Sequence, residues 1–591
     1  MLYEFDVTLS ILGPVLTQSS GPGAYGVDSA FARDHENRPY LPWTLIKGRM
    51  REAFEELGFA QTEQWFGPRP QGGGNRANPN GSFVRFNTRL SGTDFVLQTN
   101  SADLCRRRRI EIDPKRNAAN EQMMQVLESA VPPGGVGEFA GVIRFEAATE
   151  PAGEVAMRIR KALEWAGCFG ANTTVGFGRL KEAAVKQRAP QTTTVSAQTE
   201  RIRLTLTTSD PFCVTERRSE NNLFESGSVI PGGVIKGALA AQWMRELGKE
   251  TPVIEPGCDS KREALARHFA AIRFSHAAPR AIRQTVRPSA VPLSVAYVNE
   301  RWVDYALCNE PPQDLAVAVA FAPDWKDSEA GAAREMFGWR NVNTELRVRT
   351  QISREQRRAQ EHALFAYEMV KPQPLVWDLE IDVSAAGPDS AAVRDQLLGL
   401  LSGGVRGVGK TKAHFSAAPG GQIPRVCESR AEPERGKWIV VLETPALLLN
   451  GPELQGKRGR GDLLEAYRRV WRQISGGSLE LSHFFARQRL QGGLYLYRRF
   501  QHGNEHGYEP YLPTDAGSVF VLETAEGRDR EARGRIAQWL KHGLDVPQWA
   551  LERFRRSERG GDWWSNNPYV PENGFGEVSV NGKLPEGVER A

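Results

Sequence analysis

The feature that most constrains the fold is an internal repeat. The segment LPWTLIKGRMREAF at 41–54 resembles IPGGVIKGALAAQW at 230–243. Each gives a proline, three residues and Ile-Lys-Gly, and then apolar positions at helical spacing. A strand-like segment precedes each copy, and a glycine-rich turn follows much later, at 173–181 and at 403–415. The repeat predicts two modules built on one plan, the second with the longer insertion.

A third module is expected after the charged linker at 428–437. It begins with the apolar segment WIVVLETPALLLN at 438–450 and closes with the glycine turn NGFGEVSV at 573–580, but it lacks the Ile-Lys-Gly element. A polar, Thr- and Gln-rich linker at 186–200 separates the first two modules. Strands alternate with helices in every module, which predicts an α+β fold. The expected domains are residues 1–190, 200–427 and 436–591.

Composition argues against several other classes of protein. The 591 residues contain no apolar run near the ~18 residues that a membrane helix needs, and the N-terminus lacks the basic region of a signal peptide. We therefore expect a cytoplasmic protein without a membrane partner. The six cysteines form no CxxC pair, and Cys258, His268 and His276 fit no standard zinc spacing. Neither a disulfide framework nor a zinc ribbon is expected.

Arginine-rich runs indicate an acidic polymer as the partner. The net charge is +5, and arginine clusters as RRRR at 106–109, as RVR at 347–349, near 354–358 and as KRGR at 457–460. The planar arginine fork suits phosphate better than the lysine point charge does. A single run of this kind is usually a solvated face, but four runs in separate modules favour RNA or DNA.

The repeated lysines are candidate phosphate ligands. Lys47 and Lys236 are expected to open helices, where backbone N–H groups and a lysine bind phosphate well. The alternative for either residue alone is an exposed lysine without a ligand. Because the two recur in equivalent places, contact with RNA is favoured.

The string GVRGVGKT at 404–411 matches the P-loop pattern of nucleotide-binding proteins letter for letter. A P-loop follows a buried strand and opens a helix, whereas a helical pattern precedes this string and a strand-like one follows it. We therefore expect no nucleotide cofactor, and ATP hydrolysis is the disfavoured alternative. The glycines are interpreted as a loop that approaches RNA, with Arg406, Lys410 and Lys412 neutralising phosphates.

Asp28 is the leading catalytic candidate. It lies in a Gly- and Ser-containing loop ahead of the first Lys-Gly element, where a carboxylate can reach solvent. RNA is cut when a 2′-oxygen attacks its own phosphorus, and a carboxylate can orient that hydroxyl or hold Mg²⁺. From the residues alone, an aspartate that caps its own loop is the stronger interpretation. Asp34 is the second candidate but is expected to be a turn residue, and His35 a bystander.

These elements resemble the RAMP proteins of CRISPR effector complexes, which pair a Leu-Lys-Gly element with a late GFG-like turn. The resemblance implies ferredoxin-like, RRM-like (RAMP) modules in tandem, with long insertions. Residues 1–190 resemble a type III backbone subunit, best at 26–51 and again at 106–135, and residues 200–591 resemble the type III-D handle-binding, group-five-type subunit. The latter match rests on 287–295, 346–368, 438–449 and 515–523. One departure is that Trp43-Thr44-Leu45 and Gly232-Gly233-Val234 replace the family's usual Gly-Ser-Ser.

The resemblance implies a natural fusion of two subunit types that binds guide RNA at its 5′ handle and adjacent guide. Its first module would cut a paired target RNA at one position, with Mg²⁺ or another divalent metal at Asp28. The implied partners are guide CRISPR RNA, target RNA, other RAMP backbone subunits, a small subunit and a large polymerase-like subunit. A non-catalytic scaffold and a guide-RNA processing nuclease remain as alternatives. The candidate RNA-binding residues are Lys47, Arg49, Arg106, Arg107, Arg179, Lys236, Arg349, Arg406, Lys410 and Lys412.

Overall fold

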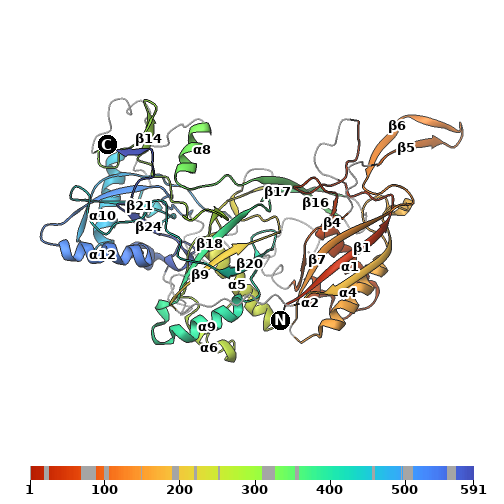
Figure 1. Cartoon of the computed structure of the whole chain (residues 1–591), viewed down its shortest axis with the longest axis horizontal. Coiled ribbons are helices and arrows are strands. Elements are labelled where there is room, and N and C mark those ends of the chain that lie inside the picture. The colour runs from red at the N-terminus through yellow and green to blue at the C-terminus, as the bar shows by residue number, and fades with distance from the viewer. Residues whose placement is uncertain are drawn as a thin grey trace.

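Three α+β modules follow one another along the chain, from the first module at the right of Figure 1 to the third at the left. Each consists of an antiparallel sheet with helices packed against it, which confirms the expected fold class. The computed structural model describes residues 2–18, 26–67, 88–98, 105–147, 149–189, 199–218, 222–249, 253–308, 327–352, 359–454, 459–493, 496, 510–554 and 567–591.

The sheet of the first module buries one face under helices. Along β1 (Leu2–Leu12), Phe5, Val7, Leu9 and Ile11 are buried and alternate with more exposed residues, as a half-buried strand requires. Helices α1 (Trp43–Glu56), α2 (Thr62–Phe66) and α4 (Ala152–Ala166) contribute apolar side chains to the same core. The strand order is β2 (Tyr40–Leu41), β4 (Phe95–Leu97), β7 (Val136–Glu146), β1 and β8 (Arg179–Gln187), with β3 (Leu90–Gly92) also paired to β7.

The second module repeats this plan and adds a smaller sheet. Helices α5 (Gly232–Glu246), α6 (Glu263–His268) and α9 (Ser390–Leu401) supply its core together with the larger sheet. That sheet has the order β12 (Arg273–Phe274), β18 (Leu375–Asp382), β9 (Arg201–Thr207), β20 (Ala413–Pro419) and β19 (Val405–Val408), with β13 (Ala278–Ala281) on β18. The smaller sheet has the order β10 (Thr215–Arg218), β11 (Leu223–Ser226), β17 (Ala359–Val370) and β16 (Thr344–Ile352).

The third module also takes up a segment from the middle of the chain. Its sheet has the order β22 (Leu479–Phe485), β23 (Val519–Thr524), β21 (Lys437–Leu442) and β24 (Val578–Val580), with helices α10 (Arg460–Ile474), α12 (Asp529–His542) and α13 (Gln548–Phe554). Strand β15 (Arg301–Asp304) pairs with β14 (Val295–Val298) and with the C-terminal β25 (Val588–Arg590). Next to β15, Tyr305 and Ala306 pack against Ile439 and Val441 of β21, and helix α8 (Asp327–Met336) ends beside this segment. Residues 295–306 therefore belong spatially with the third module.

The two copies of the repeat form equivalent helices, but neither lysine is the first residue of its helix. Helix α1 begins at Trp43 and α5 at Gly232, so Lys47 and Lys236 are each the fifth residue of a helix. Pro42 and Pro231 are the N-cap residues, each in an extended conformation that ends the preceding strand-like segment. The predicted Lys-Gly turn is therefore helix interior. No helix in the described part of the chain is long and apolar enough to cross a membrane.

Candidate nucleic-acid interface

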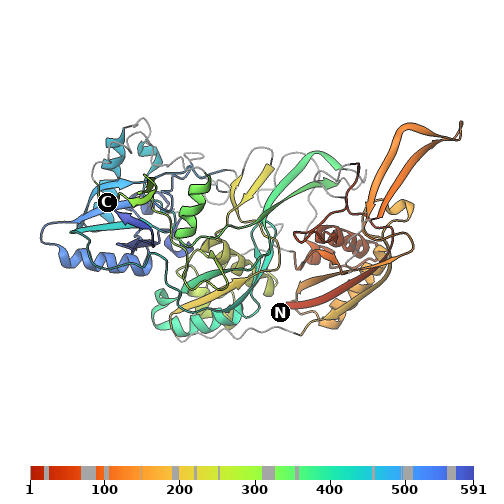
Figure 2. The same ribbon diagram turned by 45° about the horizontal axis from the view of Figure 1, so that its top comes forward.

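A two-stranded arm projects from the first module, as Figures 1 and 2 show. It is formed by β5 (Cys105–Asp113) and β6 (Ala118–Ser129), which pair with each other in a sheet of their own. At ~3.3 Å per residue the arm reaches about 30 Å. A two-stranded ribbon has little independent stability, so an arm of this length suggests a role in contacting another molecule.

Arginines alternate between the two faces of the arm. The guanidinium of Arg107 lies 5.5 Å from the ring centre of Phe177, and Arg109 Nη1 donates to Asn172 Oδ1 at 3.3 Å. Phe177 and Asn172 flank η1 (Thr173–Val175) in the late glycine turn, so this face leans on the module. Arg106, on the alternate face, is exposed. The arm thus divides the RRRR run into anchoring and outward-facing side chains.

Between the arginines and the charged turn at its tip, the arm carries exposed apolar side chains, which were not predicted from the sequence. The exposed fractions of Ile110, Ile112, Met123 and Met124 are 55%, 57%, 54% and 56%. Ile110 pairs directly with Met124 across the two strands. Exposed apolar groups of this kind mark contact surfaces. The available signal was the alternation of Ile with acidic residues directly after the arginine run.

Asp28 lies at the base of this arm. Its N–H donates to the carbonyl of Val126 at 2.9 Å, and its Oδ2 accepts from the N–H of Val126 at 2.6 Å. Ser29 forms a short parallel bridge with Leu127, so the loop adds to the edge of β6. The carboxylate is therefore held by the arm and does not cap its own loop, while the residue stays exposed.

The surroundings of Asp28 limit how a metal would bind. The described residues contain no group of three or more His, Cys, Asp or Glu side chains arranged to hold a metal ion. Asp28 would therefore be a single protein ligand, with water and phosphate oxygens completing the shell. Mg²⁺ is commonly bound in that way in phosphoryl chemistry, so the residues fit this ion.

Asp34 is a turn residue, as expected. Its Oδ1 accepts from the N–H groups of Glu36 at 3.0 Å and Arg38 at 2.8 Å, and its Oδ2 accepts from the Arg38 side chain. Its carboxylate is only 6% exposed. Both oxygens of the Asp34 carboxylate are thus bonded within the turn that leads to Tyr40.

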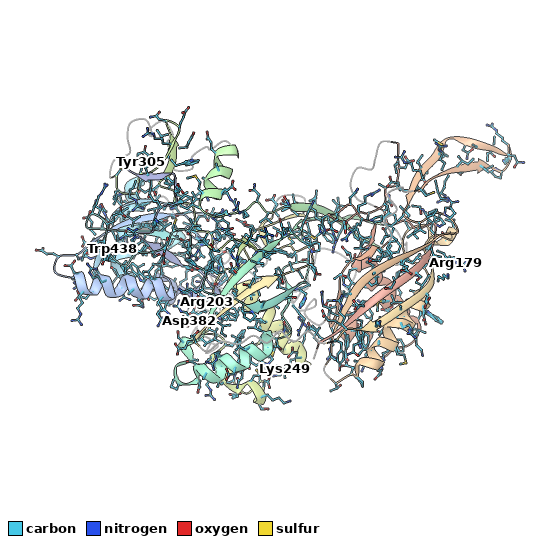
Figure 3. All side chains as sticks on the ribbon, in the orientation of Figure 1. Arg179, Arg203, Lys249, Tyr305, Asp382 and Trp438 are labelled. Carbon is cyan, nitrogen blue, oxygen red and sulfur yellow. The ribbon has the colours of Figure 1, made fainter. Side chains whose placement is uncertain are left out.

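A second cationic group lines a cleft between the first and second modules. This cleft has a volume of about 450 Å³ and includes Arg349 from β16 and Lys412 from the glycine loop, opposite His35 and Trp43 of the first module. Lys410 lies just outside it, with Nζ 4.7 Å from the ring centre of Phe224. The structure therefore separates the predicted RNA-binding residues into an arm group and a cleft group. Arg179 is exposed at the start of β8, on the outer side of the first module in Figure 3.

The start of helix α1 is occupied by a carboxylate. Asp94 Oδ1 accepts from the N–H of Trp43 at 2.8 Å, and Asp94 Oδ2 accepts from Arg347 of the second module. The guanidinium of Arg347 also lies 4.9 Å from the ring centre of Tyr40. Burial raises the pKa of Tyr40 to about 12. In the structure this helix end therefore forms a joint between two modules.

Lys236 is a structural residue and not a surface ligand. It is 9% exposed, and its Nζ donates to the carbonyls of Ala270 at 2.7 Å and Ile272 at 2.9 Å. Burial lowers the pKa of Lys236 to about 7. The expectation of an RNA contact fails because the ammonium satisfies two buried carbonyls that follow α6.

Arg406 is also buried, at 4% exposure, and ties the first two modules together. It donates to Glu146 Oε1 at 3.2 Å and to Glu246 Oε1 at 3.0 Å. Arg245 donates to the same Glu146 carboxylate. Burial alone would raise the pKa of Glu146, but the two guanidinium groups together hold it below its ordinary value. The predicted phosphate contact is therefore replaced by an ion-paired joint.

Arg49 closes the end of a neighbouring helix. Its Nη2 donates to the carbonyl of Ala166 at 2.7 Å and its Nε to that of Cys168 at 3.3 Å, at the C-terminus of α4. Its Nη1 pairs with Glu52 at 2.6 Å. This set of partners makes it a structural residue too. Lys47, on the same helix, is half-buried.

The P-loop pattern lies in a strand–turn–strand unit. Strand β19 covers Val405–Val408, a turn follows, and β20 begins at Ala413. Gly409 has φ +67°, and a Cβ there would lie 2.3 Å from the carbonyl oxygen of Cys213. A P-loop opens a helix, and the chain here opens a strand. The glycines are therefore needed for close backbone packing.

Two family models match the chain in different regions. The RAMP superfamily matches residues 8–181, and the CRISPR-associated protein (Cas_Cmr3) family matches residues 278–554. No curated protein matches. The arm, the loop of Asp28 and the first repeat all fall within the first match, and β14 to α13 fall largely within the second.

Two solved structures are distantly similar. One, titled the type III-B Cmr-beta bound to cognate target RNA, has 18% identity and a TM-score of 0.24 over 32% of this chain and 62% of its own. The other, the same assembly with AMPPnP in state 1, has 11% identity and a TM-score of 0.30 over 60% and 92%. Both scores are too low to establish a common overall structure. Residues 8–181 therefore resemble the RAMP superfamily and residues 278–554 the CRISPR-associated Cas_Cmr3 family, and together with the α+β fold these matches support a RAMP-type CRISPR-associated subunit.

Proposed function

We propose that this chain binds guide RNA in a CRISPR RNA-targeting complex and that its first module engages the paired target. The observation that carries the proposal is the arm, with arginines near its base, apolar side chains further out and Asp28 bonded to its inner strand. Guide RNA, target RNA and other RAMP subunits are the partners that the family resemblance implies.

The arm has the chemistry to separate stacked bases. Apolar side chains inserted between base steps unstack them and kink a duplex, and Ile110, Ile112 and Met124 are exposed for that role. Arg106 and Arg108 would neutralise adjacent phosphates, and each contact with a single strand adds to the salt dependence of binding. The arm would therefore hold RNA and displace a nucleotide from pairing.

A displaced nucleotide beside Asp28 is a plausible substrate for cleavage. Freed from stacking, its 2′-oxygen can align with the phosphorus and the leaving oxygen, which a regular A-form strand prevents. The N–H of Val126 fixes one oxygen of the Asp28 carboxylate. The carboxylate would orient the 2′-hydroxyl or bind Mg²⁺ through a phosphate-bridged shell. The upstream product would carry a 2′,3′-cyclic phosphate and the downstream product, whose 5′-oxygen leaves and is protonated, a 5′-hydroxyl.

A non-catalytic scaffold is the second candidate. The bond between Asp28 Oδ2 and the Val126 N–H favours it, because that bond also serves to attach the loop to the arm. Both candidates predict RNA on the arm, but only the first predicts cleavage at Asp28.

Ultraviolet crosslinking tests the shared part of the proposal. The full chain, purified with its co-expressed partners, would be irradiated and its RNA-linked peptides identified by mass spectrometry. We expect crosslinked peptides from 105–129, at the arm. Crosslinks confined to the third module, with none from the arm, would contradict the proposal.

A further inference from the structure

The joint between the second and third modules contains a polar cavity of about 210 Å³. Strands β9 and β18 form one side, and the end of α12 and Glu577 close the other. Figure 3 shows Arg203 and Asp382 close together at this joint. None of the predicted RNA-binding residues lies in it.

Three buried polar atoms of the cavity lining make no hydrogen bond with any described residue. They are Arg287 Nε, a donor, and two acceptors, Asp382 Oδ2 and Glu577 Oε2. Asp382 Oδ2 has only longer ion-pair contacts, at 3.6 Å to Arg201 and 4.0 Å to His542. Buried polar atoms normally have partners, so a cavity that concentrates three without them is built for something polar.

The charges around the cavity are nearly balanced. Glu577 pairs with Arg425 at 2.7 Å, and Glu380 pairs with Arg203 at 2.9 Å and Arg201 at 3.2 Å. Burial and the neighbouring Arg425 lower the pKa of Arg287. One donor and two acceptors are left over, so a simple anion or a simple cation satisfies only some of them. The ligand must offer donors and acceptors together.

We propose that this cavity binds one nucleobase, with guanine the best fit. Guanine offers N–H donors on one edge, for carboxylates such as Asp382 and Glu577, and acceptors at O6 and N7 for an arginine such as Arg287. Ile423 and Leu540 are the apolar residues of the lining that lie outside the core of the second module, and Arg201 and Arg203 offer guanidinium planes for stacking. The volume equals about seven waters at ~30 Å³ each, which suits one base and not two.

This inference rests on the proposed function, because an RNA bound by the protein would place one of its bases in the cavity. A guanine presented by an RNA chain and a free guanine nucleotide share the same chemistry. The cavity would therefore give the second half of the protein a means to read one position of an RNA, separate from the phosphate contacts of the arm.

Calorimetric titration of the full chain tests it. GMP should bind at least about tenfold more tightly than AMP, CMP or UMP, because an arginine–guanine pair discriminates by that order. IMP lacks the 2-amino donor and should bind several-fold more weakly than GMP. Asp382→Asn should weaken GMP at least about tenfold, while Asp395→Asn, an exposed carboxylate on α9 with 66% side-chain exposure, should leave it unchanged.

The RNA tetramers UUGU and UUUU distinguish the two sources. Tighter binding of UUGU than UUUU, lost in Asp382→Asn, supports a base presented by RNA, and binding of GMP with no such preference supports a free nucleotide. Equal binding of all nucleotides, or no difference between GMP and IMP, would overturn the inference, whether or not the variant folds. If UUUU binds as tightly as UUGU, guanine binding in the cavity is contradicted while the proposed RNA binding is retained. If neither RNA binds, the proposed function is contradicted.

Discussion

The first and second modules carry the same Lys-Gly helix but use their cations in different ways. In the second, Lys236 and Arg406 are buried and bind carbonyls and carboxylates inside the protein. In the first, the arm places Arg106 and Arg108 at the surface, beside an exposed aspartate. The second module's copy of the helix is covered at its start by η8 (Pro571–Asn573) of the third module, whose Asn573 lies against Gly232 and Gly233.

The difference shows that a sequence repeat determines the position of a residue in the fold but not which residues surround it. Both lysines are the fifth residue of equivalent helices, yet η8 of the third module lies against the start of α5, whereas Asp94 and Arg347 lie at the start of α1. In the second module Lys236 and Arg406 are structural, whereas Lys410 and Lys412 stay exposed. In the first module Arg49 is structural, whereas Arg106 and Arg108 are exposed.

The largest expected effect is on cleavage by the first module. Asp28→Ala should reduce target cutting at one position about 10²- to 10⁴-fold, the usual contribution of a positioned acid–base group, while RNA binding changes by no more than a few fold. Gel analysis of the cleavage products in the assembled complex gives the result. Asp34→Ala, which alters a turn, is the control. Unchanged product bands with Asp28→Ala would favour the scaffold.

The next effect is on stability at the joint of the first two modules. Arg406→Ala removes one of two guanidinium groups from buried Glu146 and should lower the free energy of unfolding by about 3 kcal/mol. Thermal unfolding should show it as a lower Tm, with RNA affinity otherwise retained. Arg108→Ala should lower RNA affinity and leave the Tm unchanged. Loss of RNA binding by a folded Arg406→Ala variant would contradict the view that buried cations are structural and exposed cations bind RNA.

A smaller effect concerns Lys236 and pH. Burial lowers its pKa to about 7 in the folded chain, against ~10.4 when unfolded. Between these values the unfolded chain holds more protons, so this lysine makes stability rise with pH. The stability of the wild type relative to Lys236→Met should therefore increase from pH 7 to pH 9. A difference that is flat over this range would mean that the ammonium keeps its ordinary pKa.

The sequence pattern predicted the fold class better than the site. Apolar periodicity and the repeat specify α1, α5 and the strands before them, because burial of an apolar stripe is a local property. Asp28 was placed in an exposed loop correctly, but its bonding to Val126, about a hundred residues later, depends on long-range pairing. The burial of Arg406 depends on Glu146 in another module. No local pattern distinguishes an arginine that meets such a partner from one that meets solvent.

We propose that RNA is held by the arm's outward arginines and not by the buried cations of the repeat. The direct test is the affinity of the full chain for a single-stranded RNA as a function of salt concentration. The double variant Arg106→Ala/Arg108→Ala should bind more weakly, and its slope of log affinity against log salt should be shallower by about 1.4, at ~0.7 for each lost phosphate contact. Arg49→Ala, a structural arginine of the same module, should keep the wild-type slope. An unchanged slope in the double variant, together with a reduced slope in Arg49→Ala, would contradict the account.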